Sequence, residues 1–240
     1  MLKLNEYCIA APVGRELCFA FVSDLHDAEN EPILAAIKKS GAKAVLAAGD
    51  VIHDSLIFER GIEFLRRSAE LYPTFCSLGN HEMKFDGDIR TLILGTGAVL
   101  LDNSWYEYGG IIIGGLTSGY KNEADQGNTK ETPPPDLTFL KKFASLGGFK
   151  LLLCHHPEYF DKYIKNLDVG LTLSGHAHGG QWRFFGRGLF SPGQGLFPKY
   201  TSGLYCGKLI VGRGIGNPQL IPRINNPPEV ILVRLIPERG

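Results

Sequence analysis

Three apolar runs near the start of the chain, each followed by polar residues and then by a helical pattern, restrict the fold most strongly. The runs span residues 17–22, 44–48 and 73–78, and the helical patterns follow at 31–39, about 55–71 and around 89–94. Successive strand–helix units place their strands in parallel in one sheet, with the carboxyl ends of the strands along one edge. We therefore expect an α/β protein whose functional site lies along that edge.

The pattern changes after residue 98. Short strands at 98–101, 105–108 and 111–114 are separated only by Asp-Asn and Gly-Gly pairs, which predicts antiparallel hairpins. A helix is expected from about 137 to 146 and a short one near 158–165. Further strands or hairpins are expected at 150–154, 171–174, 203–211 and 230–235.

Two segments are predicted to be loops. Residues 118–136 are polar and end in a proline run, and residues 182–201 are dense in glycine and aromatic side chains, with Arg183, Arg187 and Lys199 between them. These cations either clamp a phosphate or solvate the loop. No internal repeat or linker divides the sequence, so residues 1–240 are expected to form one domain.

Composition narrows the function classes. The 25 basic and 25 acidic residues cancel, so bulk charge does not draw the whole molecule onto nucleic acid or an anionic membrane. Five cysteines, several within apolar runs, argue against a disulfide scaffold. No run reaches the roughly 18 apolar residues of a membrane span. We expect a cytoplasmic protein, free or at the membrane periphery.

Histidines gather where the predicted strands end. Five of the seven directly follow apolar strands, in company with two aspartates and an asparagine; the set is His26, His81, His155, His176, His178, Asp24, Asp50 and Asn80. Imidazole and carboxylate ligands together suit Zn, Fe or Mn rather than an all-oxygen Ca or Mg site. The sequence therefore predicts a transition-metal site.

A pair of metal ions is the arrangement that best uses this many ligands. Two cations about 3.5–4 Å apart need a shared carboxylate to offset their repulsion, and Asp50 is the candidate bridge. Such a pair generates hydroxide near neutral pH for in-line attack on a phosphoryl group. A phosphate ester is the expected substrate.

The order of these residues resembles the five blocks of the calcineurin-like metallophosphoesterase superfamily. The blocks are Asp24-x-His26, Gly49-Asp50, Gly79-Asn80-His81-Glu82, His155 and Gly175-His176-Ala177-His178. The resemblance implies a four-layer α/β/β/α sandwich of two mixed sheets flanked by helices, with metals at the strand ends.

The resemblance also implies roles for individual residues. One metal would be held by Asp24, His26 and His178, the other by Asn80, His155 and His176, with Asp50 between them. His81 would face the phosphate and protonate the leaving oxygen. The ions would be two divalent transition metals, Mn, Fe or Zn.

Other positions are similar to a bacterial branch of this superfamily or depart from its pattern. Gly179-Gly180-Gln181 and the glycine-rich stretches 199–205 and 212–216 are similar to a branch that includes enzymes acting on lipid-linked or cell-envelope phosphodiesters. Where some relatives carry an aspartate that orients the catalytic histidine, this chain has His53. His156 stands where many relatives have asparagine and is interpreted as a residue held by the turn before Pro157.

Two other functions compete with hydrolysis of a small or lipid-linked phosphodiester, such as a nucleotide or sugar nucleotide. One is a non-catalytic, protein-binding scaffold, which would be expected to lack several ligands. The other is a nuclease, which the absence of a basic stripe disfavours, so no stable nucleic-acid partner is expected. Glu82 is interpreted as a residue of a helix start.

Overall fold

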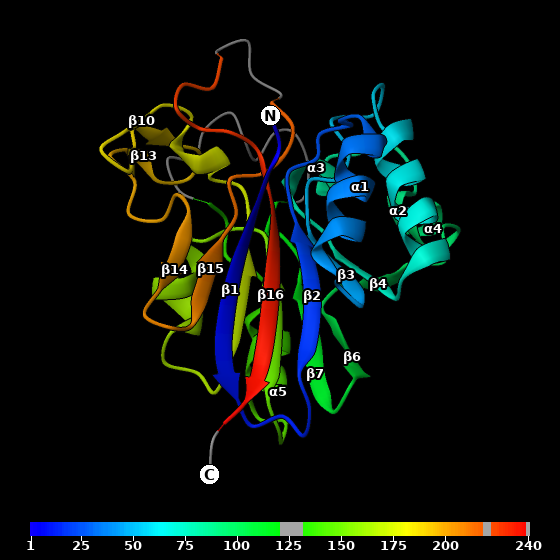
Figure 1. Cartoon of the computed structure of the whole chain (residues 1–240), viewed down its shortest axis with the longest axis vertical. Helices are drawn as coiled ribbons and strands as arrows, with labels where there is room; N and C mark the ends of the chain where they lie inside the picture. The colour runs from blue at the N-terminus through cyan, green and yellow to red at the C-terminus, as the bar shows by residue number, and fades with distance from the viewer. Residues whose placement is uncertain (121–131, 218–221, 239–240) are drawn as a thin grey trace.

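Two six-stranded sheets form the centre of the molecule in the computed structural model, which describes residues 1–120, 132–217 and 222–238 (Figure 1). In strand order, the first sheet contains β1 (Lys3–Ala11), β16 (Glu229–Pro237), β2 (Leu17–Val22), β3 (Ala44–Ala48), β4 (Thr74–Ser77) and β5 (Val99–Leu101). The second contains β14 (Gly203–Tyr205), β15 (Leu209–Val211), β9 (Leu171–Ser174), β8 (Lys150–Cys154), β7 (Ile111–Leu116) and β6 (Ser104–Tyr108). Both sheets mix parallel and antiparallel pairs.

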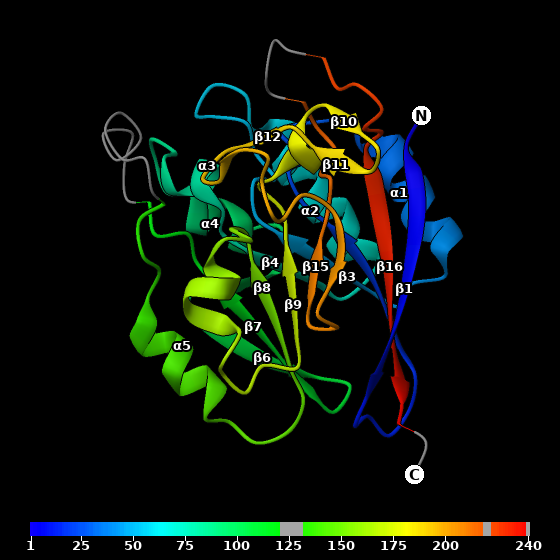
Figure 2. The same ribbon diagram turned by 90° about the vertical axis from the view of Figure 1, so that its left-hand side faces the viewer.

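Helices cover the outer faces of the two sheets. Helices α1 (Asn30–Ser40), α2 (Glu59–Leu71) and α4 (Ile89–Leu94) pack against the first sheet and lie together on the right of Figure 1. Helix α5 (Leu137–Ala144), seen beside the second sheet in Figure 2, and the π-helix η2 (Phe160–Ile164) pack against the second sheet. One apolar cluster lies between the two sheets. A second lies between the first sheet and its helices, and a third lies between the second sheet and its helices. This confirms the predicted α/β sandwich.

The predicted parallel edge is present. Strands β2, β3 and β4 pair in parallel, as do β7, β8 and β9, so the loops that follow them meet at one end of the molecule. Local signals fix the helices between them. Gly41 ends α1 with a left-handed φ of 74°, and Asp136 caps α5 by accepting the N–H groups of Thr138 and Phe139.

The helix expected from about 55 begins four residues later, at Glu59. The Asp54 carboxylate accepts the backbone N–H groups of Leu56 and Ile57, each at 2.8 Å, and this side-chain turn competes with the first helical turn. Leu56 and Ile57 are consequently exposed.

The strand prediction needs three corrections. β5 pairs in parallel with β4 rather than forming a hairpin with β6, because the chain crosses between sheets at Asp102-Asn103. β1 was not predicted. The loop expected at 182–201 contains two minimal hairpins, β10 (Arg183–Phe184) with β11 (Arg187–Gly188), and β12 (Phe190–Ser191) with β13 (Gly195–Leu196). Most of the loop predicted at 118–136 lies outside the described residues.

Candidate metal centre

The loops after the strands hold most of the predicted ligands in a strained backbone. Asp24, His26, Asp50, His176 and His178 all have φ between 44° and 64°. Residues with a Cβ rarely adopt this region, and tertiary contacts must hold them there. Two such contacts are the N–H of His26 donated to the Asp50 carbonyl and the N–H of His176 donated to Asp24 Oδ1.

The first ligand cluster contains Asp24, His26 and His178. Their ligand-type atoms all lie within 4.8 Å of one another, and all three residues are buried. His26 Nε2 lies 3.2 Å from His178 Nε2, and Asp24 Oδ1 lies 3.6 Å from the same atom of His178. Two nitrogens bound about 2.1 Å from one metal at a tetrahedral angle are separated by roughly 3.3 Å. The cluster therefore has the dimensions of a metal site.

The second cluster contains Asp50, His155 and His176, again within 4.8 Å of one another. His155 Nδ1 donates to the Ala48 carbonyl at 2.8 Å, which directs Nε2 toward Asp50 Oδ2 at 2.9 Å. Burial opposes a charge on this ring, but the Asp50 carboxylate and then Asp24 raise the pKa of His155 to about 10. The buried Oδ1 of Asn80 has no hydrogen-bond partner among the described residues.

Asp50 lies between the two clusters. Its Oδ2 is 2.9 Å from His155 Nε2 and 3.9 Å from His26 Nε2, while its Oδ1 accepts the backbone N–H of His81 at 2.9 Å. His155 Nε2 also lies 3.9 Å from Asp24 Oδ1, so the two clusters are contiguous. One carboxylate oxygen thus faces ligands of both clusters.

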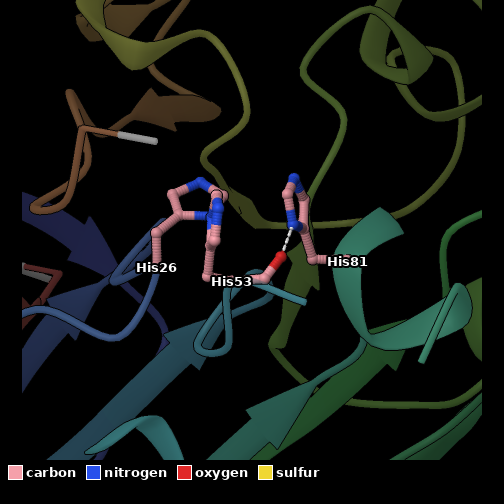
Figure 3. Close-up of side chains that lie close together, drawn as sticks. All are labelled: His26, His53 and His81. Carbon is pink, nitrogen blue, oxygen red and sulfur yellow. Dashed lines mark hydrogen bonds between the residues drawn. The ribbon is translucent and has the colours of Figure 1, made fainter. Parts of the chain in front are cut away.

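His81 stands at the side of the centre rather than in either cluster. Figure 3 shows its ring beside those of His26 and His53, with the His53 backbone oxygen directed at it. Its Nδ1 donates to that carbonyl, and its Nε2 lies 3.9 Å from Asp50 Oδ2. The group that orients His81, which the sequence left unassigned, is therefore a main-chain carbonyl.

The chemistry of the donor set fits a transition metal. Burial lowers the pKa of His26, His176 and His178, which keeps these rings neutral and able to bind a cation. Buried lone pairs on Asp24 Oδ2, Asn80 Oδ1 and His176 Nε2 have no partner in the described part of the chain. Burying such atoms without a partner is costly, and a bound cation would satisfy them.

Glu82 has a larger role than the helix-start interpretation gave it. This buried carboxylate accepts four backbone N–H groups, those of Asp50, Val51, Ile52 and Gly79, at 2.8–3.2 Å. Burial and then the Asp50 charge raise its pKa. Glu82 therefore joins the loops after β3 and β4 and fixes the position of Asp50.

Two further groups behind the ligands were missed. Arg223 Nη2 lies 3.3 Å from His178 Nδ1, and its guanidinium also donates to the carbonyls of Arg213, Gly214 and Gly216. The link from Arg223 to His178 spans 45 residues, so no local pattern marks it.

Glu158 stands behind the other cluster. Its ligand-type atom lies within 4.8 Å of those of His156 and His176. His156 is buried, with Nε2 2.7 Å from Ser118 Oγ and Nδ1 3.4 Å from Glu158. The sequence interpretation had His156 held by the turn before Pro157, whereas its side-chain contacts are with Ser118, 38 residues away, and with Glu158.

Known proteins with similar sequences identify the family of this chain. A family model described as calcineurin-like phosphoesterase matches residues 18–180, which contain both clusters. The chain belongs to the calcineurin-like phosphoesterase family. An uncharacterized metallophosphoesterase of Aquifex aeolicus is 26% identical, over 98% of this chain and 92% of that protein. The uncharacterized metallophosphoesterase YkuE of Bacillus subtilis is 27% identical, over 90% and 76%.

A solved structure shares the family fold. The phosphopantetheinyl hydrolase PptH from Mycobacterium tuberculosis superposes with a TM-score of 0.51 at 14% identity, covering 86% of this chain and 92% of that one. This likeness concerns the fold. The family model and the named relatives confirm the metallophosphoesterase class predicted from the sequence, together with metal dependence at the level of the family.

Two of the cations expected either to clamp a phosphate or to solvate a loop make contacts within the protein. Arg183 is buried and donates to the Gly179 carbonyl and to Thr201, and Lys199 pairs with Asp161. The five cysteines are free thiols. Across residues 1–120, 132–217 and 222–238, no helix is long and apolar enough to cross a bilayer.

Proposed function

We propose that the chain hydrolyses phosphate esters, with phosphodiesters as its main substrates, at a centre of two divalent transition-metal ions. The observation that carries this proposal is the position of Asp50, whose Oδ2 faces His155 in one cluster and His26 in the other. A carboxylate that faces buried imidazoles of both clusters is what two mutually repelling cations need.

In this proposal the ligands divide as the two clusters do. Asp24, His26 and His178 hold one ion, and Asn80, His155 and His176 hold the other, with Asp50 shared. Bound Mn, Fe or Zn would supply Lewis acidity and lower the pKa of a water so that it attacks phosphorus near neutral pH.

His81 acts as the general acid in this proposal. Because its Nδ1–H is committed to the His53 carbonyl, Nε2 is the nitrogen available for proton transfer. Hydroxide, formed when a water releases a proton to solvent, makes the new bond to phosphorus while the ester P–O bond breaks, and the leaving oxygen takes the proton from Nε2 of the protonated His81 ring. The ring then regains a proton from solvent. The His53 carbonyl holds the ring in the orientation that this transfer requires.

The finer assignments are also proposals. On the basis of its Gly179-Gly180-Gln181 extension, we propose that the chain belongs to the bacterial branch that includes enzymes acting on lipid-linked or cell-envelope phosphodiesters. We further propose that residues 1–240 form one domain, because the last strand pairs with both β1 and β2, and Asn226 donates to the His178 carbonyl at 2.7 Å.

Turnover by purified protein tests the proposed function. The protein, loaded separately with Mn, Fe or Zn, is assayed on bis(p-nitrophenyl) phosphate and on p-nitrophenyl phosphate. We expect metal-dependent hydrolysis that is faster with the diester. Failure to hydrolyse either compound with every metal would favour the protein-binding scaffold, and cleavage of single-stranded DNA faster than either would favour the nuclease.

A further inference from the structure

The two small hairpins that follow the His176–His178 turn expose an unusual number of large apolar side chains. We call residues 182–200 the cap. Five of its side chains are exposed: Phe184, Phe185, Phe190, Leu196 and Phe197. Figures 1 and 2 show the hairpins side by side at one end of the molecule. Single exposed apolar residues are ordinary on a protein surface, but a cluster of this kind marks an interaction site.

The backbone of the cap is strained where it presents two of these rings. Phe185 has a φ of 51° and Phe197 a φ of 52°, a region in which bulky residues are disfavoured. Phe185 is fully exposed and Phe197 is 77% exposed, so neither ring gains burial that would offset this cost. Glycine or asparagine would be less strained at both positions. Folding therefore does not account for phenylalanine at these two positions.

Charge in and beside the cap favours an anionic partner. The cap contains no aspartate or glutamate and three cations, of which Arg183 is buried and Lys199 pairs with Asp161 outside the cap. Arg187 is exposed. Beside it, Lys3, Arg183 and Arg213 line a cavity of about 520 Å³ together with Phe184 and Phe185. Aromatic tips next to cations suit the interfacial region of an anionic bilayer.

The cap is joined directly to the metal centre. Arg183 Nη1 donates to the Gly179 carbonyl at 2.7 Å, and the N–H of Leu189 donates to the Gly180 carbonyl at 3.0 Å. Gly179 follows His178, a residue of the first cluster. A surface that the cap binds would therefore lie close to the centre.

We infer that the cap is a docking surface for anionic lipid bilayers. The exposed aromatic side chains enter the interfacial layer, and Arg187 and Lys3 contact lipid phosphates. This inference rests on the exposure, strain and charge of the cap, and it does not depend on the chain being a hydrolase. Because the chain has no net charge, bulk electrostatic attraction would not account for binding, which the cap itself must provide.

Vesicle co-sedimentation of the full chain tests the inference. We expect wild-type protein to pellet with mixed phosphatidylglycerol–phosphatidylcholine vesicles and to remain largely in the supernatant with phosphatidylcholine alone. The double variant F185N/F197N removes both rings at positions where asparagine tolerates the backbone, so it should fold and bind about tenfold more weakly. Arg187→Gln should weaken binding several-fold and reduce its dependence on salt.

Leu71→Asn provides a matched control. Leu71 is 64% exposed at the end of α2, close to the 68% of Leu196 in the cap, but it belongs to the outer helical layer. L71N should pellet like the wild type. Wild-type protein that stays in solution with anionic vesicles would overturn the inference, as would equal losses in L71N and F185N/F197N.

Light scattering on the same protein samples tests whether the cap instead mediates self-association. A wild-type dimer that F185N/F197N converts to a monomer, without any vesicle binding, would show that the cap binds a second copy and would overturn the inference. Because these readouts measure binding, they stay informative if turnover assays fail.

Discussion

The two ligand clusters share Asp50 but differ in the charge that lies behind them. The guanidinium of Arg223 lies behind His178 and can only donate hydrogen bonds, so His178 Nδ1 accepts one from it. The neutral ring of His178 therefore carries its proton on Nε2. That nitrogen faces His26 and must lose the proton before it binds a metal. Behind His176 lies the carboxylate of Glu158. Each cluster therefore holds a proton that a metal must displace, on His178 Nε2 in the first and on His155 in the second, where burial opposes the charge but Asp50 raises the pKa to about 10. Only the first cluster also has a neighbouring cation.

The second cluster instead has a neighbouring anion, and the buried Oδ1 of Asn80, which we propose as a further ligand there, has no hydrogen-bond partner among the described residues. A nearby carboxylate strengthens a histidine ligand, whereas a nearby cation repels the metal. We therefore expect two metals of unequal affinity, with the tighter one at Asn80, His155 and His176. Four substitutions test this comparison, beginning with the largest expected effect.

Asp50→Asn should break both clusters at once. The amide removes the negative charge that faces His155 and His26, so neither ion has its repulsion offset. We expect loss of metal by elemental analysis and a decrease in turnover of about a thousandfold or more. A variant that retained both ions would rule out Asp50 as the bridge.

His81→Ala should separate catalysis from metal binding. Its ring lies outside both clusters, so both ions should remain bound while kcat falls about 10²–10³-fold. His53→Ala is the matched control, because it keeps the backbone carbonyl that orients His81, and its kcat should fall far less than that of H81A. Wild-type turnover in H81A would remove His81 from the mechanism.

Glu82→Gln should destabilise the loop that carries Asp50. The amide places an N–H group among four backbone donors in a buried site, so some of them lose their acceptor. We expect the free energy of unfolding in urea to decrease by about 2–3 kcal/mol. Glu70→Gln, on an exposed position of α2, is the control and should be near neutral. Equal stability of E82Q and the wild type would contradict the positioning role.

Glu158→Gln should affect only the tighter metal. Removing the charge behind His176 should lower the affinity for the ion at Asn80, His155 and His176 about tenfold and leave the affinity for the other ion unchanged. Calorimetric titration of metal into metal-free protein resolves the two affinities. A change in the weaker site alone would reverse our assignment of the two clusters.

The proximity of these side chains could be predicted because the carboxyl ends of parallel strands meet at one edge. His26, His81 and His155 follow strands that local apolar patterns identify, and the structure brings them together. Arg223 and Glu158 were not predicted, since their contacts join distant parts of the chain. The carbonyl of His53 was missed for another reason: the sequence specifies side chains and gives no direct sign of which main-chain group points at His81.

The errors in the fold have similar causes. β1 is an edge strand, and most of its side chains are exposed or only partly buried, so it lacks the apolar pattern that marks a central strand. The start of α2 depends on a turn held by Asp54. The residues there also repeat with a helical period, and the prediction followed that period rather than the turn.

Anomalous scattering from a crystal grown with Mn or Zn tests the central claim most directly. Our account predicts two peaks about 3.5–4 Å apart, one on each side of Asp50, with Asp24, His26 and His178 around one and Asn80, His155 and His176 around the other. The peak at Asn80 should have the higher occupancy at limiting metal. A single peak, or metal bound away from Asp50, would contradict the account.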